Sequence, residues 1–313
     1  MTGRSQPLVT TVLGAGQIGL PLARFLAARG HVVSVLRRGP PGPAIPGVSW
    51  LQGDLLDPPT AANACAGADV VFNTVNPAQY HRWDRLLPPL FRAAWAAARD
   101  AGARLVQLDN LYMVGRPRKT PFDEQTPPRP CAPMGRLRAE LAEELMELHR
   151  RGDLQVACGR ACDFFGPGAA NTAVFRPDLL AAVRRGGTVR VFGDPDTPHG
   201  YAFTHDVAQA LAILGEHEEA FGRIWHLPVA WKGTTRALID RFAARAGTRV
   251  RVRRVPSAAL RVFGLVAPVL RAVAEMSYQW DVAFVPDDSA IRGAFDPPTT
   301  PLDEAIDRTL TDS

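Results

Sequence analysis

The stretch VLGAGQIGLPLARFLAARG (12–30) constrains the fold more than any other part of the chain. An apolar run, LVTTVL (8–13), leads into it, and a second apolar run, HVVSVL (31–36), follows it. Apolar residues recur between the two runs at helical spacing, which is typical of an amphipathic helix. The sequence therefore predicts a strand, a glycine-rich turn, a helix and a second strand in succession.

The three glycines of this turn stand in GxGxxG order at Gly14, Gly16 and Gly19. The first permits a tight turn, the second lets the backbone approach a pyrophosphate, and the third lets helix and strand pack closely. Free N–H groups at the start of the helix then hold phosphates, with Gln17 and Ile18 beside them. We predict a dinucleotide site here; the alternative is a glycine turn that binds no ligand.

The end of the second strand indicates which dinucleotide binds. An acidic residue there would hold a ribose 2′-hydroxyl group, but the chain has Arg37 and Arg38. Because a guanidinium pairs with a phosphate through charge-assisted hydrogen bonds, we expect NADP(H) to be preferred over NAD(H). The alternative is that two exposed arginines only reflect an arginine-rich composition.

Two further segments follow apolar strands and should line the same cofactor. GDLLD (53–57) places Asp54 near the adenine, with Leu55 beside it. NTVN (73–76) places Asn73 and Val75 on the ribose side.

Short apolar strands alternate with helices through the first half of the chain. Repeated βα units of this length predict an α/β fold of the Rossmann type, with a doubly wound parallel sheet. We assign residues 1–166 to a dinucleotide-binding domain, to which part of 188–230 returns, and 167–313 to a smaller, mostly helical substrate-binding domain. The segment 257–275 predicts a pair of amphipathic helices that cover a pocket or pack in the core, since charged residues and a proline interrupt it before the ~20 apolar residues of a membrane span.

The charge, the cysteines and the N-terminal residues limit the kinds of partner that we expect this protein to bind. The net charge is +5, but the arginines are scattered in runs no longer than a pair, so we expect no nucleic-acid partner. The four cysteines form no CxxC pair and no cluster with metal-ligand spacing, which predicts no metal site and a reducing, cytoplasmic setting. The N-terminus has no apolar signal region, and we expect no membrane partner.

Four later segments, taken with the glycine turn, carry a resemblance to a known family. They are GDLLD (53–57), LVQLDNLYMVG (105–115), GRACDFFGPG (159–168) and YAFTHDVAQA (201–210). In this order they resemble the extended short-chain dehydrogenases/reductases, the NAD-dependent epimerase/dehydratase family. The resemblance implies a Rossmann domain, a nicotinamide cofactor and a homodimer formed through the helices at 82–101 and 134–151.

The resemblance also implies where the catalytic groups should stand. The family uses a Ser or Thr, then a Tyr and a Lys four residues apart on one helix. Those places fall on Asn110, Met134 and Arg138. Met134 cannot carry a proton and is expected to contact the substrate instead, whereas Arg138 can still bind the nicotinamide ribose. Tyr112 is the nearest substitute proton donor; its alternative role is an aromatic wall of the site.

The substrate side departs from the family as well. Nucleotide-sugar members usually carry an arginine just before the segment that matches YAFTHDVA, where it clamps a diphosphate, but this chain has PHG there. His199 and Tyr201 are therefore expected to meet a small, non-nucleotide substrate, together with Asp163. Tyr80 and Trp83 supply an aromatic side of the pocket, unless they pack inside a helix face.

These observations predict an NADP-dependent oxidoreductase that transfers hydride between the cofactor and a carbonyl or alcohol. Two alternatives stay open. One is a non-redox isomerase or cyclase on the same scaffold, and the other is an NADP-binding sensor without turnover.

Overall fold

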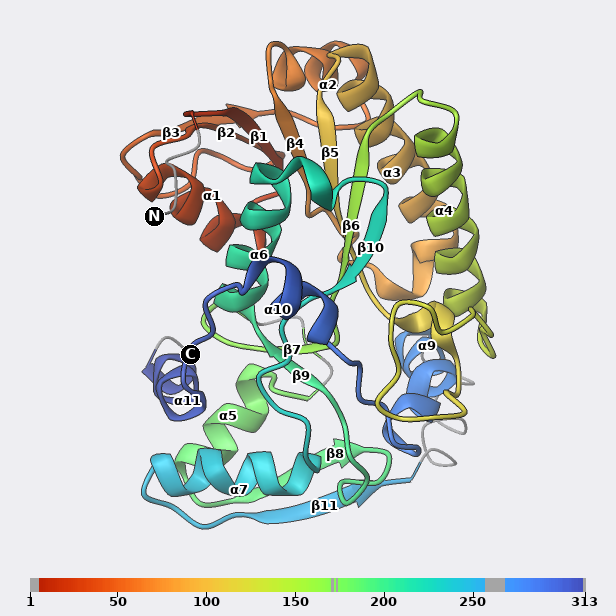
Figure 1. Cartoon of the computed structure of the whole chain (residues 1–313). Coiled ribbons are helices and arrows are strands. Elements are labelled where there is room, and N and C mark those ends of the chain that lie inside the picture. Colours follow the sequence, from red (N-terminus) through yellow and green to blue (C-terminus); the bar gives the residue numbers. More distant parts are fainter. Residues whose placement is uncertain (1–5, 170–171, 173, 257–267, 312–313) are drawn as a thin grey trace.

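The computed structural model describes residues 6–169, 172, 174–256 and 268–311. Its centre is a seven-stranded sheet in which every pairing is parallel (Figure 1). The strand order is β10-β6-β5-β4-β1-β2-β3, so the direction of winding reverses between β1 and β4. The strands are β1 (Val9–Leu13), β2 (Val32–Arg37), β3 (Val48–Gln52), β4 (Val70–Asn73), β5 (Arg104–Asp109), β6 (Val156–Arg160) and β10 (Arg223–His226). This arrangement confirms the predicted doubly wound α/β fold.

Helices cover both faces of the sheet, and each face has its own apolar core. The helices of one face are α1 (Gly19–Ala28), α6 (Thr204–Glu216) and α10 (Ser289–Phe295). Those of the other face are α2 (Pro58–Cys65), α3 (Trp83–Asp100) and α4 (Pro133–Arg150). Local sequence sets where some helices begin: the Asp57 carboxylate caps α2 by accepting from the Thr60 N–H at 3.2 Å, and proline opens both α2 and α4.

A smaller part lies below the sheet in Figure 1 and has a third core, rich in phenylalanine. It contains α5 (Pro177–Arg184), β8 (Thr188–Phe192), α7 (Thr235–Arg245), β11 (Arg251–Val255) and α11 (Leu302–Thr311). β8 and β11 form a two-stranded parallel ladder, and β7 (Asp163–Phe165) with β9 (Tyr201–Phe203) forms another. The sequence predicted a mostly helical part here and missed β11, because arginines occupy its outward positions and hide the alternation of valines.

Two helical elements from the C-terminal part of the chain precede its return to the sheet. They are α9 (Pro268–Met276) and the 3₁₀ helix η4 (Ser277–Trp280). The first half of the predicted helix pair, residues 257–267, lies outside the described residues. Two further 3₁₀ turns, η1 (Tyr80–Arg82) and η2 (Tyr112–Val114), follow β4 and β5; a third, η3 (Glu218–Ala220), precedes β10.

The chain returns to the sheet after residue 283. Phe284 and Ile291 are fully buried in the core on the α1–α6 face. Asp288 is 1% exposed and accepts from Lys232 Nζ at 2.6 Å, Arg292 Nε at 2.7 Å and the Val229 N–H at 2.9 Å. This carboxylate therefore fastens the segment around α10 to the loop that leaves β10.

Asp206 lies in the first turn of α6, which begins at Thr204. The Asp206 carboxylate accepts from the backbone N–H and the hydroxyl of Thr300, at 3.1 and 2.7 Å, and so ties α6 to the segment before α11.

Candidate active site

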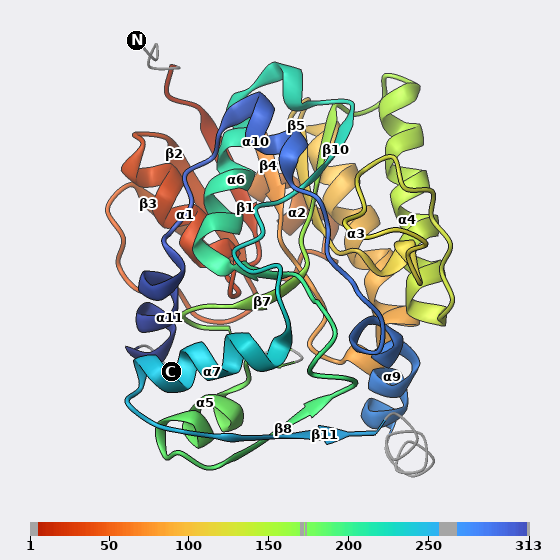
Figure 2. The same cartoon turned by 60° about the horizontal axis from the view of Figure 1, so that its bottom comes forward.

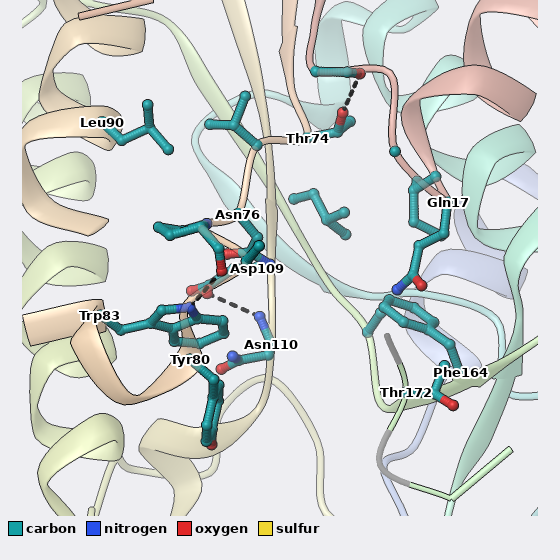
Figure 3. Close-up of a pocket in the computed structure, with 18 of the residues that line it drawn as sticks. Gln17, Thr74, Asn76, Tyr80, Trp83, Leu90, Asp109, Asn110, Phe164 and Thr172 are labelled. Carbon is teal, nitrogen blue, oxygen red and sulfur yellow. Dashed lines mark hydrogen bonds between the residues drawn. The ribbon is translucent and has the colours of Figure 1, made fainter. Parts of the chain in front are cut away.

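A cleft of about 1540 Å³ opens at the carboxyl ends of the parallel strands. It runs from the glycine turn after β1 to η4 and α9. In the close-up, Trp83, Tyr80 and Asn110 stand on one side of the cavity and Gln17, Phe164 and Thr172 on the other (Figure 3). Since α/β sheets bind ligands where their winding reverses, the cleft lies where a cofactor is expected.

The glycine turn has the geometry of a phosphate cradle. Gly14 has φ +93°, a conformation that side chains disfavour. A Cβ at Gly19 would lie 1.9 Å from the Gly14 carbonyl oxygen, whereas one at Gly16 would face open space. The Thr74 hydroxyl lies 3.0 Å from the carbonyl oxygens of both Leu13 and Gly14, and so pins the turn to β4. No acceptor in the described residues bonds the N–H groups of residues 15–18, which leaves them free for an anion.

Five of the residues predicted to bind the cofactor line the end of the cleft beside the glycine turn: Arg37, Arg38, Asp54, Leu55 and Val75. The Arg37 guanidinium lies 5.8 Å from the centre of the Trp50 ring, which holds its side chain over β3. Among the residues that the structure describes, neither arginine has an acidic partner. Both charges are therefore available to a ligand.

Asn73 does not line the cleft, contrary to the sequence prediction. Its side chain is fully buried and turns toward β5, where Nδ2 donates to Gln107 Oε1 at 2.9 Å. Its Oδ1 accepts from the Val75 N–H at 3.3 Å, which shapes the strand end. Asn76 lines the cleft in its place.

Arg138 lies at the base of the cleft as half of a buried ion pair. It is 1% exposed, and its Nη1 donates to Asp109 Oδ1 at 2.9 Å while Nη2 donates to Asn76 Oδ1 at 2.8 Å. The guanidinium stands 4.6 Å from the centre of the Trp83 ring and 5.1 Å from that of Phe91. Its charge is thus balanced by Asp109, an interaction the sequence did not reveal because the partners are 29 residues apart.

Tyr112 is the phenol nearest the end of β5. The Asn110 side chain accepts from the Tyr112 N–H at 3.1 Å, so Asn110 orients the turn that carries Tyr112. The Tyr112 ring stacks on Trp83 with centroids 6.3 Å apart. Burial, with a smaller effect of the Asp163 charge, raises the pKa of Tyr112 to about 12. The hydroxyl therefore keeps its proton at neutral pH.

Tyr80 extends this aromatic group. Its ring meets Trp83 edge-on with centroids 4.7 Å apart, and its hydroxyl is hydrogen-bonded to that of Tyr112. Burial, and then the neighbouring Tyr112, raise the pKa of Tyr80 well above its usual value. The predicted aromatic wall is present, since Tyr80, Trp83 and Tyr112 all line the cleft.

Two residues expected to meet substrate are core residues instead. Met134 is 6% exposed and packs between α3 and α4, because the first turn of α4 tucks under η2: a Cβ at Gly135 would lie 2.6 Å from the Tyr112 carbonyl oxygen. Tyr201 is fully buried in the third core, where its hydroxyl lies 2.8 Å from the Thr235 hydroxyl. Neither lines the cleft.

Asp163 and His199 meet at the far end of the cleft, and both line it. His199 Nε2 lies 2.9 Å from Asp163 Oδ2, which also accepts from Trp280 Nε1 at 2.8 Å. His199 Nδ1 lies 3.2 Å from the Gln279 carbonyl oxygen, an acceptor, so each ring nitrogen faces an acceptor. Within the described residues Asp163 Oδ1 has no partner, and it is the oxygen free to meet a ligand.

The sequence named none of the individual residues that the C-terminal elements bring to the cleft, although the helix pair predicted at 257–275 was expected to cover a pocket or to pack in the core. No motif marked these residues, because they come from α9 and η4, far along the chain. Arg176, which precedes α5, also lines the cleft, but its guanidinium is held by Asp178 at 2.9 Å. The missed lining residues from α9 and η4 are Val269, Leu270, Val273, Gln279 and Trp280.

A model of the NAD dependent epimerase/dehydratase family matches residues 10–227. The chain belongs to that family. A curated relative, an uncharacterized protein named y4nG from Sinorhizobium fredii, is 26% identical over 250 residues, which are 78% of this chain and 61% of the relative. The chain thus spans about six-tenths of the length of that relative.

Solved structures of family members share the fold at low sequence identity. DesIV, a dTDP-glucose 4,6-dehydratase from Streptomyces venezuelae described with NAD bound, has a TM-score of 0.76 at 20% identity, covering 96% of this chain and 95% of its own. A UDP-N-acetylglucosamine 4-epimerase from Methanobrevibacter ruminantium M1, in complex with UDP-N-acetylmuramic acid, has a TM-score of 0.79 at 16% identity, covering 98% of each. This family member therefore has the fold of these enzymes.

Proposed function

We propose that the protein is an NADP(H)-dependent oxidoreductase that transfers hydride between the cofactor and a carbonyl or alcohol of a small, non-nucleotide substrate. The observation that carries the proposal is one continuous cleft. Its first end has a phosphate cradle and two arginines without acidic partners, and its second end has a protonated phenol and a carboxylate.

The residues at the first end fit a dinucleotide 2′-phosphate. The free N–H groups of residues 15–18 suit the pyrophosphate, and Gly16 leaves room for its close approach. Arg37 and Arg38 suit a 2′-phosphate because no carboxylate competes for their charge, and no acidic side chain ends β2 to hold a 2′-hydroxyl. DesIV is described with NAD, so Arg37 and Arg38 are the basis on which we propose a different preference.

At the reacting end, a bound nicotinamide supplies or accepts the hydride. Tyr112 gives its hydroxyl proton to the substrate oxygen as the carbonyl carbon gains hydride, and regains a proton from solvent through the Tyr80 hydroxyl. Because its pKa is raised, the Tyr112 hydroxyl is protonated at neutral pH, and in the reducing direction it enters the reaction as the acid. Arg138 stays paired with Asp109 and packs against the Trp83 ring, and it takes no part in proton transfer.

The second end favours a substrate without phosphates. The carboxylate of Asp163 repels anions, and His199 occupies the place of the family's diphosphate-clamping arginine. Apolar side chains from α3 and α9 line much of the wall, including Leu86, Leu90 and Val273. We infer a compact substrate that has an apolar portion and a hydroxyl or carbonyl group within reach of Asp163 Oδ1.

A labelling experiment tests the proposal. The purified protein is titrated with NADPH and NADH by nicotinamide fluorescence, and is then given 4-deuterated NADPH with a panel of apolar aldehydes and ketones. We expect NADPH-selective binding and transfer of deuterium to at least one product carbon. Tight NADPH binding without transfer to any member of a broad panel would count against the enzyme.

A sensor without turnover is the second candidate, favoured by one observation. The two helix positions that carry the family's Tyr and Lys now hold a core methionine, Met134, and an arginine already paired inside the protein. A sensor predicts NADPH binding with no label transfer, and a partner whose capture depends on the NADPH/NADP ratio.

A further inference from the structure

The two-stranded ladder of β8 and β11 has one covered face and one bare face. Val189, Val191 and Val252 point into the third core, where α5 and α7 pack on them. The exposed residues of the two strands are Thr188, Arg190, Arg251, Arg253 and Arg254. With α5 and α7 behind it, the ladder forms the lower boundary of the molecule in Figure 2.

The strand register gathers arginines that look scattered in the sequence. β8 and β11 pair so that Arg190 lies directly opposite Arg253, with Arg251 opposite Thr188 on the same face. Arg185 and Arg249 are exposed just before the first residues of β8 and β11. They lie near each other, because a Cβ added at Gly186 would be 3.2 Å from the Arg249 carbonyl oxygen. We call these five the arginine face: Arg185, Arg190, Arg249, Arg251 and Arg253.

The two segments that carry the arginine face contain no acidic residue that could neutralise its positive charge. Residues 184–193 and 248–255 contain no Asp or Glu. Of the arginines in β11, only Arg254 has acidic partners within the described residues, Asp281 at 2.9 Å and Asp194 at 3.6 Å. The charge of this one face equals the +5 net charge of the whole chain.

The free protein bears an electrostatic cost for this arrangement. Like charges directly opposite each other across two strands are destabilising, and Arg190 faces Arg253 in this way. An anion between the two guanidinium groups would remove the repulsion. The register therefore favours a partner that presents several negative charges on a surface.

We propose that the arginine face docks the protein on a membrane surface rich in anionic phospholipid. The face is a two-stranded ladder outside the cleft, and side chains on one side of a strand repeat every ~6.6 Å, so several lipid phosphates meet guanidinium groups at once. None of the exposed ladder residues is aromatic, so the stacking platforms that hold single-stranded nucleic acid are missing.

The position of helix α9 also supports docking on a membrane surface. In Figure 2, helix α9 lies at the lower right of the molecule, above the right-hand end of β11. Its Val269 is 48% exposed and also lines the cleft, next to Leu270 and Val273. An apolar side chain at a cleft mouth near a basic face suits a protein that meets apolar compounds at a lipid surface. No helix in the described part of the chain is long and apolar enough to cross a bilayer. The proposed contact is peripheral, and it departs from the expectation of no membrane partner that the sequence alone supported.

Vesicle co-sedimentation of the full chain tests the proposal without any substrate. Vesicles of phosphatidylglycerol and phosphatidylcholine are compared with vesicles of phosphatidylcholine alone. We expect binding only to the anionic vesicles, with loss of binding at about 0.5 M salt because exposed charges are then screened. The triple variant Arg190→Glu/Arg251→Glu/Arg253→Glu should weaken partitioning by more than about tenfold.

The matched control is Arg118→Glu/Arg129→Glu/Arg136→Glu, which makes the same charge change at exposed arginines without acidic partners elsewhere in the described chain. It should bind vesicles within about twofold of the unaltered protein. The test variant keeps a like-charged pair across the ladder, and its melting curve and NADPH binding should not change, which separates docking from folding and from the proposed enzyme.

Three results would overturn the proposal. Equal losses in the two triple variants would mean that net charge alone attracts the protein. Release from anionic vesicles by millimolar inorganic phosphate at constant ionic strength would indicate a free-anion site rather than a lipid surface. Tighter binding to an oligonucleotide duplex than to anionic vesicles would assign the arginine face to nucleic acid.

Discussion

Replacing Arg37 by serine should abolish the preference for NADPH over NADH. The Arg37 guanidinium is half-buried over Trp50 and has no acidic partner in the described chain, so its charge is not already neutralised before the cofactor arrives. A hydrogen bond to a charged group contributes ~1.5–3 kcal/mol. The Kd for NADPH should therefore rise by about 10- to 150-fold, while the Kd for NADH stays within about twofold.

Nicotinamide fluorescence titration of each cofactor measures both constants. Arg38→Ser should have a smaller effect, because Arg38 is more exposed than Arg37 and solvent screens its charge. Arg136→Ser serves as the control, since Arg136 is exposed on α4 and outside the cleft. A parallel rise of both Kd values in Arg37→Ser would refute the reasoning, because it would mean that Arg37 holds the turn rather than a 2′-phosphate.

Four other changes have defined outcomes. Tyr112→Phe should keep NADPH binding but slow product formation about 10²- to 10⁴-fold, measured on any carbonyl found in the labelling screen; unchanged turnover would exclude Tyr112 as the donor. Arg138→Met should lower the free energy of unfolding in urea by ~3–5 kcal/mol, because it leaves the Asp109 carboxylate buried and unpaired, and Asp109→Asn in the same chain should restore part of the loss. Gly19→Ala should weaken both NADPH and NADH, since the new Cβ meets the Gly14 carbonyl; retention of both affinities would contradict the cradle. Burial raises the pKa of Tyr112 from 10 to about 12, so above pH 10 the unfolded chain loses this proton first; in urea titrations, the unaltered chain should lose more stability than Tyr112→Phe between pH 10 and pH 12, by order 2 kcal/mol at pH 12, and equal losses would contradict the burial of this hydroxyl.

The sheet and the cofactor end of the cleft could be predicted from local sequence. Each βα unit contains its own signals: an apolar strand, a turn and an amphipathic helix. Gly14, Gly16 and Arg37 all follow directly from strand ends, where parallel sheets gather ligands. The place of each of these residues relative to its own strand is therefore enough to predict that it lies at the cleft.

The substrate end could not be predicted in the same way. Trp280 reaches Asp163 across 117 residues, and no pattern near either residue indicates the contact. Met134 and Tyr201 were expected in the cleft from the family alignment, but the local packing of α4 and of the third core buries both. Side-chain direction at such positions depends on neighbours from other elements, and a single sequence does not specify them.

The late return of the chain to the sheet has a consequence for how the protein is made. β10 forms the outer edge of the sheet, and α10, which comes near the C-terminus, packs beside it. During synthesis the N-terminal strands leave the ribosome long before Phe284 and Ile291 can fill their core. A nascent chain stopped after residue 166 should therefore expose apolar surface and bind chaperones, and the core on the α1–α6 face should be completed only after the segment around α10 has been released.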